Sequence, residues 1–397
     1  MLHDQHIALG VTGSIASYKA ADLASKLTQA GARVDVIMTE AATRFVTPLT
    51  LRSLTGRPVF IDMFDPSTEL AEEHVEIARR AAAVIVAPAS ANTIAKLAHG
   101  LADDMVSLTV LATEAPVLLA PAMDNQMFEH AATQANLESL RGRGYEIVGP
   151  AEGRLASGRM GLGRLVETET LVGALKQALG RRGDLAGRRI VVSAGGTREP
   201  IDPVRVITNY SSGKMGYALA EAARDRGAAV TLVSTVATLP TPYGVGLVAV
   251  ETVAEMREAV LAACQGAHAV IMAAAVSDFR PAERASQKIK KGAGSISLEL
   301  ERTQDFFLEI EGPIMKVGFA AETNDLIANA RAKLTKKRLD LIVANDITAP
   351  GSGFGVDTNQ VTLLDAAGAE EALPLLPKYE VAQRVLDRVV ALLGERA

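Results

Sequence analysis

Lysine clusters and one carboxylate in the second half of the chain could together bind a polyphosphate. Asp278 follows the apolar run 267–276, where a carboxylate can hold a magnesium ion that bridges phosphates. Lys333 and Lys337 share one helix face by their i, i+4 spacing, and QKIKKGAG (287–294) adds a second basic cluster. A charge run is usually a solvated face. The net charge is −5, however, so an anionic substrate would need such local clusters. The pattern therefore predicts a triphosphate site whose lysines neutralise charge in the transition state.

Polar residues also follow two apolar runs of the first half. In GVTGSIASYK (10–19), Gly13 permits a tight turn and Ser14 can cap the next helix, whose free N–H groups could bind phosphate. The same pattern is typical of an ordinary strand-to-helix turn, and it lacks the GxGxxG of dinucleotide-binding folds. In APASANTIAK (87–96), hydroxyl and amide groups come directly after an all-apolar run, at a sheet edge where ligands bind. These groups belong to Ser90, Asn92 and Thr93. They either suit a flavin or nucleotide ring or cap a helix.

Three further stretches of the first half are individually weak signals. EEHVEIAR contains His74, and a lone histidine is more often a surface or capping residue. APAMDNQMF places Asp124 and Asn125 after another apolar run. EGRLASGRMGLGRL (152–165) interleaves glycine with arginine around Ser157, so it is either an interdomain linker or a mobile flap over a site.

Alternating apolar and amphipathic stretches predict the elements that position these residues. In the first half, strands are expected at 6–13, 33–39, 82–90, 115–123 and 145–150, with helices between them. The pattern restarts after LGRRGDLAGRR (179–189), with strands expected at 189–197, 229–235, 247–251, 267–276, 314–322 and 339–347 and a hairpin-like piece at 360–375. This βαβ repetition predicts an α/β chain of two tandem doubly wound parallel-sheet domains, Rossmann-like, the first of them flavodoxin-like. The expected domains are 1–183 and 184–397.

Composition limits the classes of protein that fit. The 397 residues are too many for one ordinary core, and 48% hydrophobic with only 4% aromatic residues suits parallel sheets packed with small aliphatic side chains. The single cysteine, Cys264, cannot form an intrachain disulfide, and no cysteine–histidine metal spacing occurs. Neither a signal peptide nor an apolar run of about 18 residues is present. We expect a cytoplasmic protein with no nucleic-acid or membrane partner.

Taken in order, the motifs of the first half resemble those of the flavin-dependent cysteine decarboxylases, and among them the phosphopantothenoylcysteine decarboxylases. The resemblance covers about residues 1–180 and rests on VTGSIA, HVEIAR, APASANT, PAMDxxM and LASGxxGxGRL. It implies FMN at the sheet edge, contacted by Gly13, Ser14, Thr39, Phe45, Ser90, Ala91, Asn92 and Thr93. It also implies that His74 is catalytic and that the glycine-rich stretch is a substrate flap. The implied substrate-binding residues are Asp124, Asn125, Arg159 and Met160, with Arg154 beside them.

In the reaction that this resemblance implies, flavin oxidises the substrate's cysteinyl thiol to a thioaldehyde-type electron sink. Carbon dioxide then leaves, because the carbanion is delocalised onto sulfur. Finally, reduced flavin and an acid return a hydride and a proton.

Two positions depart from the family's pattern. Ser157 stands where the family usually has a cysteine as proton donor, and an alcohol is a much weaker acid than a thiol, whose pKa is about 8.5. Ser157 could still relay a proton from water. Asp124 stands where the family usually has an asparagine that donates hydrogen bonds to the leaving carboxylate. An ionised Asp124 would repel that carboxylate, whereas a protonated one could donate, and Asn125 could take its place. Our hypothesis is that decarboxylation persists but that the reductive step is impaired or rewired.

The second half resembles the phosphopantothenate–cysteine ligases over about residues 186–397. The motifs are GGTREPIDPVRVITNxSSGKMG, AAAVSD, KIKK, GFAAET and ANDI; SSGKMG is no Walker A motif, because Met215 follows its lysine. The resemblance implies CTP and Mg²⁺, with 4'-phosphopantothenate activated as an acyl-cytidylate that the amine of L-cysteine then attacks. Asn209 would hold the acyl-cytidylate, and Lys288 would act in the second half-reaction. The CTP pocket would comprise Met272, Ala273, Ala274, Asp278, Asp305, Phe319, Lys333 and Lys337, with Asp278 also at the metal.

Together, the two resemblances predict a bifunctional enzyme of coenzyme A biosynthesis. The first family implies trimeric contacts and the second implies dimers, from which a homo-oligomer as large as a dodecamer can be built. Two alternatives remain open. One is an active CTP ligase whose flavin half is degenerate or regulatory. The other is a nicotinamide oxidoreductase, which would need a GxGxxG with a downstream acidic residue that neither half has.

Overall fold

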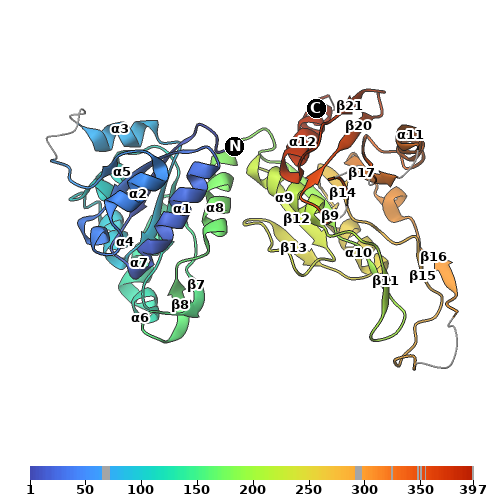
Figure 1. Cartoon of the computed structure of the whole chain (residues 1–397), viewed down its shortest axis with the longest axis horizontal. Coiled ribbons are helices and arrows are strands. Elements are labelled where there is room, and N and C mark those ends of the chain that lie inside the picture. Colours follow the sequence, from blue (N-terminus) through green and yellow to red (C-terminus); the bar gives the residue numbers. More distant parts are fainter. Residues whose placement is uncertain are drawn as a thin grey trace. The chain divides into compact units, whose positions relative to one another are not determined.

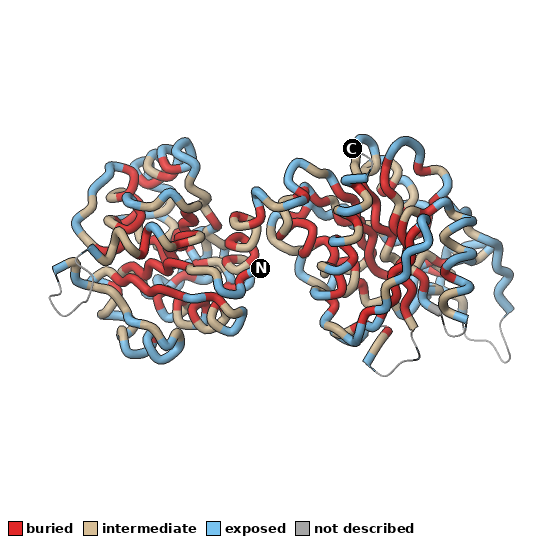
Figure 2. Tube along the Cα trace, turned by 90° about the horizontal axis from the view of Figure 1, so that it is seen from above, coloured by how far each residue is buried: buried red, intermediate tan, exposed pale blue. Residues whose placement is uncertain are grey.

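The chain folds into two compact units, Met1–Leu179 and Gly180–Ala397, each with its own sheet (Figure 1). The computed structural model describes residues 1–64, 72–290, 297–322, 325–346, 348, 351–353 and 355–395. Buried segments concentrate along the central strands of each unit (Figure 2). Within the described residues, none of the helices has the length and apolar character needed to cross a membrane.

The first unit has a six-stranded parallel sheet in the order β3-β2-β1-β4-β5-β6. The strands are β1 His6–Val11, β2 Arg33–Met38, β3 Val59–Phe60, β4 Ala83–Ala89, β5 Val117–Pro121 and β6 Glu146–Ile147. The helices are α1 Tyr18–Gln29, α2 Pro48–Thr55, α3 Glu73–Arg80, α4 Ala91–His99, α5 Met105–Ala112, α6 Asn125–Glu129, α7 Ala131–Gly142 and α8 Thr168–Gly180, with 3₁₀ turns η1 Ile15–Ser17 and η2 Glu40–Arg44.

Apolar runs become the central strands because both faces of the sheet are covered by helices. All seven residues of β4 are buried, as its uninterrupted apolar sequence predicts for a strand covered on both sides. On one face, α3, α4, α5 and α7 pack over the sheet, with Ile94, Val106 and Leu137 against Val86. Helices α1 and α2 pack against each other beside β2.

The strand order of the first unit creates a crevice between β1 and β4, because the chain turns to opposite sides of β1 in its two halves. The buried Thr12 hydroxyl ties the carboxyl ends of these strands together. It donates to Pro88 O at 2.7 Å and accepts from Ser90 N–H at 2.9 Å.

The glycine-rich stretch is an antiparallel hairpin within the first unit and does not connect the two units. Its strands are β7 Ala151–Arg154 and β8 Met160–Arg164. The turn is closed by Leu155 N–H on Arg159 O at 2.8 Å and by Gly158 N–H on Leu155 O at 2.9 Å. Gly158 has a φ of +82°, which glycine adopts at no steric cost.

The second unit has an eight-stranded sheet in the order β13-β12-β9-β14-β17-β18-β20-β21, in which the first six strands are parallel. They are β9 Arg189–Ala194, β12 Ala229–Ser234, β13 Gly246–Ala249, β14 Ala269–Met272, β17 Met315–Glu322 and β18 Leu341–Asp346. The antiparallel strands β20 Val361–Asp365 and β21 Glu370–Ala372 confirm the hairpin expected at 360–375. Short two-stranded pairs are β10 Arg198–Pro200 with β11 Val206–Thr208, β15 Phe279–Pro281 with β16 Leu300–Arg302, and β19 Thr358–Asn359 with β22 Leu376–Pro377.

Helices also cover both faces of the second sheet. Helices α9 Lys214–Asp225 and α12 Lys378–Gly394 pack together on one face, and α10 Val253–Ala263, α11 Leu326–Lys336 and the 3₁₀ turn η3 Phe306–Glu309 lie on the other. The stripe expected on the last helix is buried: Val381, Val385, Val389 and Leu393. The fold class predicted from the sequence, two tandem doubly wound α/β sheets, is confirmed.

Candidate active sites

A cavity of about 490 Å³ lies in the first unit at the carboxyl ends of β1 and β5. It is lined by the segment 14–19 that opens α1, by residues 122–124 after β5, and by both sides of the hairpin. Ser14 and Asp124 from the sequence-based site line this cavity, as does Ser157. The structure therefore brings together three predicted residues that are far apart in the sequence.

The predicted cofactor residues follow β1, β2 and β4, which are neighbours in the sheet. Ser14 accepts from Ala16 N–H at 3.3 Å, and Thr39 accepts from Ala42 N–H at 3.3 Å. Ser90 caps α4 by accepting from Thr93 N–H at 3.3 Å. The capping function considered for Ser90 is therefore present, and the capped ends share one edge of the sheet. Among the others, Ala91 is half-buried, Asn92 and Phe45 are exposed, Thr93 is buried, and none of these four lines the cavity.

Position 13 requires glycine because another segment of the chain passes close to it, and not because of its backbone conformation. A Cβ atom there would lie 2.6 Å from the Ala41 Cβ. The turn after β1 thus runs against η2 at a distance that only glycine permits.

Asp124 and Ser157 form a direct pair at the tip of the hairpin. Ser157 Oγ donates to Asp124 Oδ2 at 2.7 Å, and Gln126 N–H donates to Asp124 Oδ1 at 3.1 Å. The Ser157 hydroxyl, the Gln126 N–H and the charge of Arg159 hold the pKa of Asp124 below its usual value. Asp124 is therefore an ionised carboxylate at neutral pH, the protonation state that would repel a substrate carboxylate.

The hairpin packs tightly on the segment beneath it. Met123 N–H donates to Gly163 O at 3.0 Å, and a Cβ on Gly163 would lie 2.1 Å from Met123 O. A Cβ on Gly161 would lie 3.0 Å from Asn125 Cγ. These glycines thus permit close packing of the hairpin on residues 123–125. Of the predicted contacts, Asn125 lies under the hairpin, whereas Arg159 and Met160 do not line the cavity.

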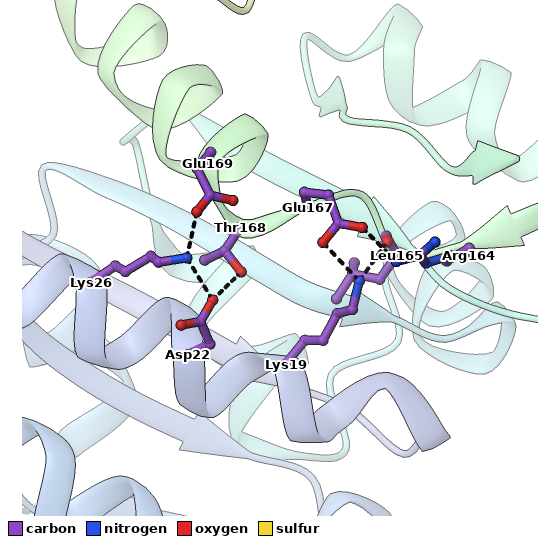
Figure 3. Close-up of polar contacts among 8 residues, drawn as sticks. All are labelled: Lys19, Asp22, Lys26, Arg164, Leu165, Glu167, Thr168 and Glu169. Atoms are coloured by element: carbon purple, nitrogen blue, oxygen red, sulfur yellow. Dashed lines mark hydrogen bonds and ion pairs between the residues drawn. The ribbon is translucent and has the colours of Figure 1, made fainter. Parts of the chain in front are cut away.

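Charged residues fix the base of the hairpin to α1 (Figure 3). Lys19, which lines the cavity, donates to Leu165 O at 3.4 Å and to Glu167 at 3.3 Å. Two turns further along α1, Lys26 pairs with Glu169 at 2.6 Å. The base of the hairpin is therefore held by this network, and its tip is held by the hydrogen bond between Ser157 and Asp124.

His74 lies away from the cavity within one chain. It is half-buried on α3 and does not line the cavity. The end of α3 is at the amino ends of the strands, because Ala82 N–H donates to His6 O and Thr113 Oγ1 donates to Ala78 O. Figure 1 shows α3 and the hairpin at opposite ends of the unit.

The second unit has a cavity of about 460 Å³ at the carboxyl ends of its central strands. It is lined by all but one of the residues predicted for the ligase site: Asn209, Met272, Ala273, Ala274, Asp278, Asp305, Phe319, Lys333 and Lys337. The exception is Lys288, which is exposed in the loop before β16. Lys291 lies outside the described residues.

Polar groups of this cavity hold one another in place. Asn209 Nδ2 donates to Ala275 O at 3.0 Å, and Lys333 Nζ donates to Phe319 O at 2.9 Å. Lys337 pairs with Asp305 at 3.0 Å. The lysines therefore already project toward acceptors inside the site, which an anionic ligand would replace.

The loop that carries Lys288 is anchored next to it. Ile289 N–H donates to Asp202 Oδ2 at 3.1 Å, and Arg205 Nη2 donates to Ile289 O at 2.9 Å. Arg205 also holds the pKa of Asp202 well below its usual value. The backbone beside Lys288 is thus fixed by an ion pair that the sequence motif gave no reason to expect.

Asp278 shares its cavity with one other predicted carboxylate, Asp305. Within the residues that the structure describes, no three His, Cys, Asp or Glu side chains cluster as a metal site. In nucleotide-dependent enzymes, Mg²⁺ is bound by one or two carboxylates together with substrate phosphates and water. A single exposed carboxylate is therefore compatible with a metal ion that arrives with a nucleotide.

Sequence reasoning missed several residues of this cavity. Lys378 and Asn359 line it, although they belong to no motif that pointed to a ligand, and Asn345 lines it from the ANDI motif without having been named as a site residue. Lys214 also lines it, from SSGKMG. At the end of α10, burial raises the pKa of the Cys264 thiol to about 11, which disfavours the nucleophilic thiolate.

Two doubly wound units, each with a cavity at the carboxyl ends of its strands, define a tandem nucleotide-type α/β chain. The Flavoprotein family model matches residues 1–180, and that of the DNA/pantothenate metabolism flavoprotein C-terminal domain matches residues 185–393. The coenzyme A biosynthesis bifunctional protein CoaBC of Bacillus subtilis is 46% identical over 406 residues, covering 100% of both chains. That of Escherichia coli K12 is 45% identical over 403 residues, covering 100% of this chain and 99% of its own. The chain belongs to this family of bifunctional coenzyme A biosynthesis proteins.

Among solved structures, the C-terminal domain of a coenzyme A biosynthesis bifunctional protein CoaBC is similar to the second unit. It is 41% identical, covers 54% of this chain and 99% of its own, and has a TM-score of 0.47.

Proposed function

We propose that the chain carries out two consecutive steps of coenzyme A biosynthesis. The second unit joins L-cysteine to 4'-phosphopantothenate at the expense of CTP. The first unit decarboxylates the resulting 4'-phosphopantothenoylcysteine to 4'-phosphopantetheine with FMN. The catalytic domains are residues 1–183 and 184–397, and the enzyme acts in the cytoplasm without nucleic-acid or membrane partners. The observation that carries the ligase proposal is the single cavity that gathers Asn209, Asp278, Lys333 and Lys337.

In the ligase step, the carboxylate of 4'-phosphopantothenate attacks the α-phosphorus of CTP, and the bond to pyrophosphate breaks. Lys333 and Lys337 offset the negative charge that gathers on the phosphoryl oxygens. Asp278 would hold Mg²⁺, which would supply further positive charge at the triphosphate. Cysteine's amine then attacks the acyl carbon and CMP leaves, with Asn209 holding the acyl-cytidylate and Lys288 supplying a positive charge from its anchored loop.

The first unit offers a fitting edge for FMN. The turns after β2, β1 and β4 lie side by side and present backbone N–H groups and the hydroxyls of Thr39, Ser14 and Ser90. Such turns suit a phosphate and a polar ring. When bound, FMN would supply the two-electron oxidation of the substrate thiol and its later reversal. The chain's own part is to bind and orient the substrate and to move protons.

The Asp124–Ser157 pair supports the hypothesis of an altered reductive step. Because the Ser157 proton is donated to an ionised carboxylate, the hydroxyl can offer a substrate only an acceptor in this arrangement. Proton delivery therefore needs a rearrangement or another donor. The same observation favours the second candidate function, an active ligase whose flavin unit is degenerate or regulatory.

The position of His74 supports association of the first unit into homo-oligomers. One chain does not bring His74 to the cavity, so a second copy would have to supply it. Trimeric contacts of this kind, combined with dimeric contacts of the second unit, would build a dodecamer. Size-exclusion chromatography with light scattering tests this, and a monomer with full decarboxylase activity would refute it.

A coupled assay tests the two activities together. Purified protein with FMN, CTP, Mg²⁺, L-cysteine and 4'-phosphopantothenate should release pyrophosphate and yield 4'-phosphopantetheine, with each intermediate tracked by mass spectrometry. Accumulation of 4'-phosphopantothenoylcysteine would leave the ligase proposal standing and reject the decarboxylase. A Ser157→Cys, Asp124→Asn double variant should then speed the last step. If it does not, the explanation based on this pair is wrong.

A further inference from the structure

The cavity of the second unit has a second basic region, on the face of the sheet opposite Lys333 and Lys337. Those two lysines come from the end of α11, whereas Lys214 and Lys378 are the first residues of α9 and α12 on the other face. Both line the same cavity. We call Lys214, Lys378 and the nearby Asn359 the basic corner.

Of the two ammonium groups in the basic corner, Lys214 pairs with a carboxylate, whereas Lys378 is held by backbone carbonyls. Lys214 Nζ donates to Asp357 Oδ1 at 2.6 Å and to Gly355 O at 3.0 Å. Lys378 is only 7% exposed, and its Nζ donates to the backbone carbonyls of Gly353 and Val356. Burial and the charge of Lys214 lower the pKa of Lys378. The corner therefore carries more positive than negative charge before any ligand enters.

Asn359 gives an independent sign that a ligand belongs here. The residue is 2% exposed and lines the cavity. Its Oδ1 accepts from Gly353 N–H at 3.4 Å and from Ser352 Oγ at 2.8 Å. Its amide nitrogen has no hydrogen-bond partner among the described residues. Because Asn359 lines the cavity, this NH₂ group is available to donate to an acceptor that enters from there.

Two helix N-termini add to the attraction for an anion. Helix α9 has 12 residues and begins after Gly213, and α12 has 17 residues and begins after Pro377. Neither has a side-chain cap on its first N–H groups. Uncapped N–H groups and the positive end of the helix dipole favour a phosphate.

We propose that the basic corner binds a phosphate group of the ligase substrates, with Lys214, Lys378 and the Asn359 amide as its donors. This inference rests on the proposed ligase function. Two groups share the required chemistry: the terminal phosphates of CTP, which leave as pyrophosphate, and the 4'-phosphate of phosphopantothenate. Either source places a dianionic group where two ammonium groups and an amide converge.

Two substitutions test the basic corner. Asn359→Asp keeps the acceptor oxygen and the shape but replaces the amide by a negative oxygen, and Lys214→Gln removes one positive charge. Each should raise the KM for CTP or for 4'-phosphopantothenate by about tenfold or more. A rise in the first KM assigns the corner to the triphosphate, and a rise in the second assigns it to the 4'-phosphate. Lys336→Gln is the matched control, because Lys336 is exposed and does not line the cavity.

A direct binding measurement separates recognition from folding. Isothermal titration with inorganic pyrophosphate and with 4'-phosphopantothenate should show weaker binding of at least one probe to Lys214→Gln, with recovery in Lys214→Arg. If both KM values and both affinities stay within about twofold of wild type, or if Lys214→Arg is as impaired as Lys214→Gln, the proposal is overturned. Absence of CTP turnover by the wild-type protein would instead refute the ligase function. The binding data would still show whether the basic corner binds a phosphate group.

Discussion

Replacement of Thr12 by valine tests how the crevice of the first unit is held together. The buried Thr12 hydroxyl bridges the ends of β1 and β4, at 2.7 Å from Pro88 O and 2.9 Å from Ser90 N. Valine has nearly the same shape but no hydroxyl. The substitution therefore removes a hydrogen-bond partner from two buried backbone groups while the packing changes little.

The size of the effect follows from those two groups. Each buried backbone group that loses its partner costs about 1–3 kcal/mol, which gives about 2–6 kcal/mol in the free energy of unfolding. In a unit of this size each kcal/mol lowers Tm by about 2–4 °C, so the Tm of the first unit should fall by roughly 4–24 °C. Because Ser90 opens α4 at the proposed FMN edge, the FMN content of the purified protein should fall as well.

Thr109→Val is the matched control. Thr109 is equally buried, but its hydroxyl donates to Met105 O at 2.8 Å within α5, a carbonyl that keeps its helical partner. We expect a loss below about 1 kcal/mol there. Scanning calorimetry and the flavin spectrum provide the measurement, and ligase turnover is the internal reference. Equal, small Tm shifts in both variants would refute the reasoning.

Three further predictions concern a glycine of the hairpin, a buried hydrogen bond of the second unit and the pH dependence of thermal stability. Gly163→Ala drives a Cβ into Met123 O, so decarboxylation should fall by about tenfold to a hundredfold with ligation unchanged. Gly142→Ala at the exposed end of α7, with nothing within 4 Å and no positive φ, is the control, and equal losses in an activity assay would contradict the packing argument. Tyr379→Phe removes a 2.6 Å hydrogen bond to a buried carboxylate on α9, which should cost about 1.5–3 kcal/mol in urea unfolding; no change would exclude this contact as a stabiliser. Burial alone would raise the pKa of Asp104, but hydrogen bonds from a lysine and a backbone N–H lower it. Asp104→Asn should therefore lower Tm at pH 7, with the difference vanishing as the pH falls below about 4; a pH-independent difference would show that charge is not the cause.

The sequence predicted the central strands because burial on both faces leaves a clear signal. Strand β4 is apolar at every position, and its end was placed within one residue. The pairs β10–β11 and β15–β16 were not predicted. Their strands have three residues each and are largely exposed, so neither apolar alternation nor an apolar run marks them.

The residues of the second site were predicted in part because its motifs stand directly after strands. The turns after β9, β14 and β17 meet at one sheet edge, which gathers Asn209, Asp278 and Phe319 once the strand order is known. Lys378 and Asn359 were missed for a physical reason. A lysine at the start of an amphipathic helix looks like any solvated charge, and its burial depends on segments that fold over it.

The glycines of the hairpin have a packing function that the sequence pattern did not indicate. Glycine between charged residues indicated a segment that folds over a ligand. In the structure, Gly161 and Gly163 instead let the hairpin pack on residues 123–125 without a Cβ between the two chains. Sequence spacing cannot separate these two uses, because both require only that no side chain be present.

The first site differs from the second in what one chain can supply. Ile15 and Tyr18 line its cavity with 59% and 63% of their surfaces exposed, and Met160 on the hairpin is 70% exposed. Large apolar side chains gathered at the mouth of a polar site are costly in water unless another surface covers them. A second copy that covers this mouth could also bring a His74 to it, which its own chain does not. Exposure at the mouth and the distant histidine therefore both support the proposed association of the first unit, whereas all but one of the residues proposed for the ligase site already line one cavity within a single chain.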